Sequence, residues 1–167
     1  MTYDEVAQRQ VSYDDRENAW LDNLWTAASS FKARLLSRLE IPDTYVDHND
    51  GAQPYVRLLQ AKVAISDAEP LSRKHGLEVD GNGNMPFAVE LRLRVRWGMR
   101  PIYIFLGARI VNGNHQYAAW HLPGNFPSTN PTWMSLDEIL MRVDGELQRY
   151  VDHDPSTGSR KDCFIFG

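Results

Sequence analysis

Arginines occupy every second position over part of the segment 87–97, at Arg92, Arg94 and Arg96. A guanidinium group binds carboxylates and phosphates through paired hydrogen bonds, and it also stacks on aromatic rings. The residues between these arginines are apolar, and an alternation with a period of two predicts a β-strand with one buried face. The other face of the strand therefore lines up three cations, which suit an acidic or anionic partner.

Two further segments, 102–111 and 115–122, follow this strand closely enough to form an antiparallel meander with it. We expect a four-residue loop over 98–101 and a three-residue loop over 112–114. This register keeps the apolar residues of all three strands on one face, whereas a shift by one residue would place arginines in the core. The register therefore decides which side chains share the face that bears the arginines.

The face away from the core combines cations with aromatic rings. In the expected register it carries Arg92, Arg94, Arg96, Tyr103, Phe105, Arg109, Tyr117 and His121. Platforms for single-stranded nucleic acid combine these residue types, and protein interfaces use the same types as anchors. The formal net charge of −4 argues against a dedicated nucleic-acid binder. We therefore favour a protein partner and keep nucleic acid or an anionic ligand on this face as the alternative.

Two plainer interpretations of the arginine row stay open. An arginine row is frequently only the solvated side of a half-buried strand, supported here by a cross-strand pair of Glu90 with Arg109. The face could also be covered by the long polar connection 66–86 or by the N-terminal residues 1–12. In either case the row has a structural role.

Two acidic patterns were weighed as metal sites. Asp80 opens the sequence D-G-N-G-N, which resembles a calcium loop but lacks its glycine at position six and its acid at position twelve. Asp80 with Glu90-Leu-Arg92 loosely matches a metal-dependent nuclease pattern in which a lysine activates water. Arginine replaces that lysine here and does not lose its proton. We predict no metal, no cofactor and no enzymatic activity, with a degenerate nuclease-like enzyme as the enzymatic alternative.

Helical periodicity is present at both ends of the chain. Apolar residues recur at three- and four-residue spacing over 13–39, and we expect residues 1–12 before this helix to form a flexible arm. Ser135 and Glu138 form a capping box that predicts the start of a second helix, which fades near Asp152. Both helices have one apolar stripe, so both can cover one face of a sheet.

The remaining segments are less regular. Residues 42–54 have loop composition, 55–65 are a candidate strand, and 66–86 form a polar connection with a candidate short strand near 77–79. The apolar tail over 164–166 could add an edge strand. These elements complete the expected order of helices and strands.

The expected fold is an α+β two-layer sandwich. It has an antiparallel sheet of about four to five strands, with a long N-terminal helix and a shorter C-terminal helix on one face. The 167 residues suit a single domain, which we place at 13–167.

Composition restricts the class of protein. Cys163 is the sole cysteine, and no signal peptide or membrane-spanning run is seen in the sequence, so we expect a cytoplasmic protein that does not bind membranes. Since no catalytic motif stands out, we predict a non-enzymatic binding protein of the adaptor, immunity or inhibitor type. The sequence leaves a homodimer open.

Overall fold

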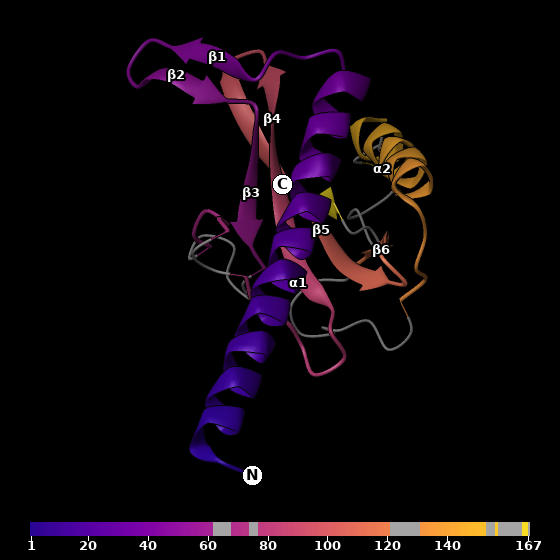
Figure 1. The fold of residues 1–167 in the computed structure, drawn as a ribbon. Coiled ribbons are helices and arrows are strands. Elements are labelled where there is room, and N and C mark those ends of the chain that lie inside the picture. Colours follow the sequence, from indigo (N-terminus) through magenta and orange to yellow (C-terminus); the bar gives the residue numbers. More distant parts are fainter. Residues whose placement is uncertain (62–67, 74–76, 121–130, 153–155, 157–164, 167) are drawn as a thin grey trace.

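The chain folds into an antiparallel sheet with both helices on one face, as the sequence predicts (Figure 1). The computed structural model describes residues 1–61, 68–73, 77–120, 131–152, 156 and 165–166. The elements in chain order are α1 (Tyr3–Arg38), β1 (Thr44–Asp47), β2 (Gly51–Pro54), β3 (Val56–Gln60), β4 (Met85–Val95), β5 (Gly98–Val111), β6 (Asn114–Ala119), α2 (Leu136–Val151) and β7 (Ile165–Phe166). Neither described helix is both long and apolar enough to cross a membrane.

The main sheet has the order β3-β4-β5-β6, and the short strand β7 pairs with β5. All its pairings are antiparallel. β7 confirms that the C-terminal tail adds a strand. The segment 77–79, in contrast, forms no strand, and β3 ends at Gln60, before the described residues stop at 61.

The hydrophobic core lies between the sheet and the two helices. Phe31 and Leu35 of α1 and Val143 of α2 are fully buried against the strands, together with Val89 and Ile104. The capping box predicted for α2 is confirmed, because Ser135 accepts from the backbone N–H of Glu138 while the Glu138 carboxylate accepts from Ser135 N–H. One face of the sheet is therefore closed by helices.

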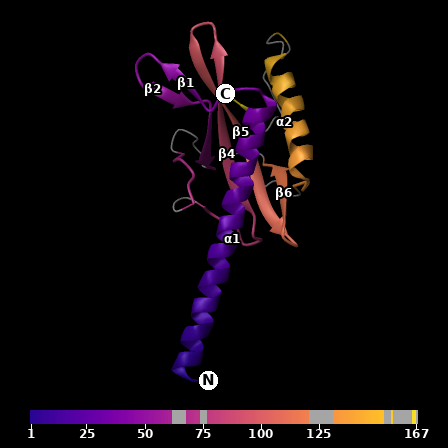
Figure 2. The same cartoon turned by 45° about the horizontal axis from the view of Figure 1, so that its top comes forward.

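α1 begins at Tyr3, ten residues before the expected start, so the predicted flexible arm is helical from Tyr3 onward. Its capping box is formed by Thr2 and Glu5. No proline or glycine interrupts the chain before Pro42, so helical hydrogen bonding continues outward without a break. Residues 1–19 are all exposed, and this half of α1 projects past the sheet (Figures 1 and 2).

The expected loop over 42–54 is a second hairpin, built by β1 and β2. Its turn is held by the carboxylate of Asp47, which accepts hydrogen bonds from the backbone N–H groups of Asn49 and Asp50. Such side-chain-to-backbone bonds are local and mark turns without marking the strands beside them. The residue composition of 42–54 therefore predicts the turn correctly but does not predict β1 and β2.

The first turn of the meander is shorter than expected and lies earlier in the chain. Val95 pairs with Gly98, so the loop consists of Arg96 and Trp97 alone. Ile102 faces Leu91 instead of Trp97, a slide of six residues that keeps the predicted faces because six is even. Trp97, expected in the core, is 87 % exposed at this turn.

The second turn also has two residues, and here the prediction of a three-residue loop is wrong. Asn112 and Gly113 have φ values of 51° and 75°, as the type I′ turn of a tight hairpin requires. The shorter loop exchanges the two faces of β6, so the side chains expected to face away from the helices face toward them. Tyr117 consequently lies in the core and Trp120 lies on the opposite face of the sheet.

Candidate functional site

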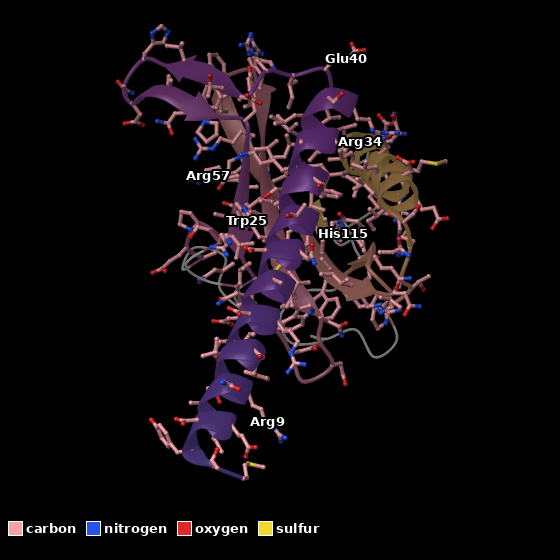
Figure 3. The ribbon with its side chains drawn as sticks, in the orientation of Figure 1. Arg9, Trp25, Arg34, Glu40, Arg57 and His115 are labelled. Carbon is pink, nitrogen blue, oxygen red and sulfur yellow. The ribbon has the colours of Figure 1, made fainter. Side chains whose placement is uncertain are left out.

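The face away from the helices is organised around one buried carboxylate, that of Glu90, which is 3 % exposed. Glu90 lies opposite Arg57 of β3 and Tyr103 of β5 in one cross-strand row. Arg57 donates from Nε to Oε1 over 2.9 Å and from Nη2 to Oε2 over 2.8 Å, and Figure 3 labels this arginine on the sheet. Arg92 donates from Nε to Oε1 over 2.9 Å. Two guanidinium groups therefore hold one carboxylate.

The electrostatic balance of this cluster keeps Glu90 ionised. Burial by itself would raise the pKa of Glu90, but hydrogen bonds from Arg57 and Arg92 and the charges of both arginines outweigh it and lower that pKa below its ordinary value. The pKa of Tyr103 is raised, first by burial and then by the negative charge of Glu90 and the hydrogen bond to it. With two cations and one anion, the cluster keeps a net positive charge.

Arg92 also fastens the β1–β2 hairpin to the sheet. Its Nη1 donates to the hydroxyl of Tyr45 over 2.7 Å, and its backbone N–H donates to the carbonyl of Tyr55. The rings of Tyr45 and Tyr55 lie 4.9 Å apart between centroids. The hydrogen bond from the backbone N–H of Arg92 to Tyr55 explains how β5 tolerates Pro101. Arg92 directs its N–H toward β3, so its partner Pro101 needs no N–H toward β4.

The β4–β5 hairpin continues past this anchored region and exposes its basic side chains. Arg94, Arg96 and Arg100 are exposed. Arg96 lies over the ring of Trp97, with Cζ 5.0 Å from the centroid. Within the described ranges none of the three forms an ion pair. The end of this hairpin therefore presents three cations and one exposed indole.

The other half of the same face is closed, contrary to the expected open aromatic platform. Phe105 is 1 % exposed and packs with Leu59, Ala88 and Trp120 in a small second core. Trp120 lies directly over Gly107, where a Cβ atom would come within 2.6 Å of its Cζ3 atom. The space beside Gly107, which has no side chain, is thus filled by an indole.

Arg109 belongs to this closed half as well. Its Nε donates to Oε1 of Gln116 over 2.8 Å, and its Cζ lies 4.4 Å from the ring centroid of Trp133. The expected pair of Arg109 with Glu90 does not form, because Glu90 faces Tyr103 in the observed register. Arg109 is therefore used in local packing.

The residues predicted to share one surface lie in different environments in the structure. Arg92 and Tyr103 join the Glu90 cluster, while Arg94 and Arg96 lie on the exposed hairpin. Tyr117 lies on the helix side, where its hydroxyl donates to the carbonyl of Ala27 over 2.8 Å and burial raises its pKa to about 12. His121 lies outside the described residues.

Sequence reasoning missed Arg57 and Tyr45 as members of the site. Arg57 had a usable signal, since Arg57 and Lys62 are the charged residues of the candidate strand 55–65 and Glu90 is the one acid of the strand 87–97. Tyr45 had none, because it sits in a segment with loop composition. Of the three arginines in the predicted row, Glu90 binds Arg92 alone.

Asp80 and Glu90, the two acidic residues weighed as metal ligands, are both engaged by groups of the protein itself. No three His, Cys, Asp or Glu side chains within the described part of the chain gather closely enough to hold a metal ion. Asp80 accepts from the backbone N–H groups of Asn82 and Asn84 and from the Asn84 side chain, so its oxygens serve a turn. Glu90 already holds two guanidinium groups, and their charge repels a divalent cation.

Comparison of the chain with protein-family models, with curated proteins and with solved structures finds no match in any of the three.

Proposed function

We propose that this chain is a non-enzymatic binding protein of the adaptor, immunity or inhibitor type, whose β4–β5 hairpin docks on an acidic surface of a protein partner. The observation that supports the proposal is the group formed by Arg94, Arg96 and Arg100 beside the exposed Trp97. Arginine and tryptophan are the residues most enriched among the energetic anchors of interfaces. Cations that form no ion pair with any described residue suit a partner that brings its own carboxylates.

The anchoring of the hairpin supports the same proposal. The Glu90 cluster ties together β3, β4 and the β1–β2 hairpin immediately below the exposed arginines. A rigid base means that little conformational entropy is lost when the exposed end binds. The arrangement therefore suits a preformed docking element.

The burial of the aromatic rings favours a protein partner over single-stranded nucleic acid. Stacking platforms need several open rings along a basic groove. Phe105 is buried, Tyr117 lies in the helix-side core, and Tyr103 is half-buried at Glu90. Of the rings on the predicted surface that the structure describes, none is fully open, and Trp97 is a single exposed indole at a turn.

The test is affinity capture with two charge-reversed variants of the full chain. Arg94→Glu with Arg96→Glu should abolish capture of a partner that the wild-type protein retains at low salt and loses at high salt. Arg142→Glu with Arg149→Glu makes the same change of charge on the exposed side of α2 and should leave capture intact. Equal capture by both variants would contradict the proposal. Loss of the signal on nuclease treatment would instead support the nucleic-acid alternative.

A further inference from the structure

The apolar side chains on the helix-side face of β4 extend beyond the part of the sheet that the two helices cover. Leu91 is 1 % exposed, whereas Val95, four residues further along β4 on the same face, is 42 % exposed. Leu93 between them lines a groove of about 440 Å³ that opens between the C-terminal ends of α1 and α2. The remaining lining residues are Arg38, Leu39, Leu91, Asp144, Leu147, Gln148 and Val151. The outer half of the hairpin thus has a helix-side face with Leu93 and Val95 on β4 and Arg100 opposite Leu93, and neither α1 nor α2 lies over its exposed end in the part of the chain that the structure describes.

At the opposite end of the molecule, α1 carries an apolar stripe without a sheet under it. Val6 and Tyr13 precede Trp20 and Ala27 at seven-residue steps, so they continue the side of the helix that faces the sheet. Val6 is 49 % exposed and Tyr13 is 54 % exposed. Figure 3 shows Arg9 on this projecting part, with no other element beside it. A helix of this length without tertiary packing is only marginally stable in water.

The two uncovered surfaces also have opposite charge. Residues 1–19 contain five acidic and two basic side chains, a formal charge of −3. The hairpin residues 93–100 contain three arginines and no acid, a formal charge of +3. Two projecting helices would repel each other, and two hairpins would do the same, whereas a helix and a hairpin attract.

We propose that the projecting half of α1 docks on the helix-side face of the β4–β5 hairpin of a second copy of this chain. The occupant covers Leu93, Val95 and the adjoining groove in the way that the inner half of α1 covers the inner half of the sheet. Each copy offers one helix and one hairpin at opposite ends, so the contact is heterologous and assembles copies head to tail. The docking face is opposite to the one that bears Arg92 and Arg94, whereas Arg100 and Trp97 serve both this contact and the proposed function. The two proposals are tested separately, because the mass of the purified chain reports this contact alone.

The experiment measures the mass of the purified full chain by sedimentation or light scattering over a range of concentrations. The wild-type protein should exceed the monomer mass as concentration rises, and high salt should shift it toward monomer. A hairpin variant, Val95→Ser with Trp97→Ser, and a helix variant, Val6→Ser with Tyr13→Ser, should each stay monomeric. An equimolar mixture of the two variants should form a two-chain species, because the intact helix of one fits the intact hairpin of the other.

Each competing arrangement gives a different result. A helix-to-helix dimer leaves the hairpin variant dimeric by itself, and a hairpin-to-hairpin dimer leaves the helix variant dimeric. Either result overturns the proposal, as does a wild-type protein that stays monomeric at every concentration. Val46→Ser with Met141→Ser removes two exposed apolar side chains elsewhere and should assemble like the wild type. Circular dichroism of all variants checks that the fold is kept, since every substituted position is exposed.

Discussion

Glu90 and Arg57 face each other across β3 and β4, with the carboxylate almost completely buried and the guanidinium reaching solvent. The pair makes two parallel hydrogen bonds, and Arg92 adds a third to the same carboxylate. These hydrogen bonds hold β3 and β4 together next to the exposed arginines of the β4–β5 hairpin. Since one buried anion holds two arginines that would otherwise repel, it is the most informative position to change.

Glu90→Gln should reduce the free energy of unfolding by roughly 2 kcal/mol at neutral pH, because two partly buried cations lose their shared anion. The folded-state pKa of Glu90 lies below its ordinary value of 4.5, so its contribution is complete above that pH and is lost as the pH falls through the lowered pKa. Denaturant unfolding from neutral pH to pH 3 measures the difference between variant and wild type. A difference that stays constant below pH 4.5 would contradict the assigned role.

Tyr45→Phe should cost about 1 kcal/mol, because it removes the hydroxyl that accepts from Arg92 and leaves the ring in place. Tyr55→Phe is the matched control, since the Tyr55 hydroxyl makes no hydrogen bond to any described residue. Denaturant unfolding of both variants tests the link between the β1–β2 hairpin and the sheet. Equal stability of the two variants would mean that this hydrogen bond contributes nothing.

Tyr117→Phe should cost about 1 kcal/mol at neutral pH, since it removes the buried hydrogen bond to Ala27. Burial raises the pKa of Tyr117 to about 12, so the wild-type protein should lose stability as the pH rises from 10 toward 12. The variant lacks the part of that loss that Tyr117 causes and keeps the part due to Tyr103, whose pKa is also raised. Ultraviolet titration of tyrosine ionisation should lose its late phase in Tyr117→Phe but not in Tyr13→Phe, where the ring is exposed.

Gly107→Ala should destabilise the protein by about 2 kcal/mol, because the added methyl group collides with the indole of Trp120 inside the second core. Gly145→Ala introduces the same methyl group on α2, where nothing lies within 4 Å. There it should stabilise by up to about 1 kcal/mol through helix propensity. Thermal unfolding followed by tryptophan fluorescence gives both values, and a harmless Gly107→Ala would show that Trp120 does not rest on β5.

The second turn explains why part of the predicted surface could not be found from sequence. A three-residue loop over 112–114 would keep the Tyr117 hydroxyl out of the core, where a buried hydroxyl without a partner is costly. The helix supplies that partner through the carbonyl of Ala27, ninety residues away in the chain. The Asn112-Gly113 dipeptide was the stronger local signal, since it is the preferred sequence of a two-residue hairpin turn.

The alternation around Arg92 determined by itself that this segment is a strand, which of its faces is buried, and that helices must cover that face. These conclusions follow from local periodicity, which the residues carry wherever the strand is placed. Tertiary structure alone decided that Arg92 is fastened to Glu90 and Tyr45 while Arg94 and Arg96 stay exposed. The reason is that register depends on turn length and on partners distant in sequence, so three equivalent arginines in the sequence acquire different neighbours in the fold.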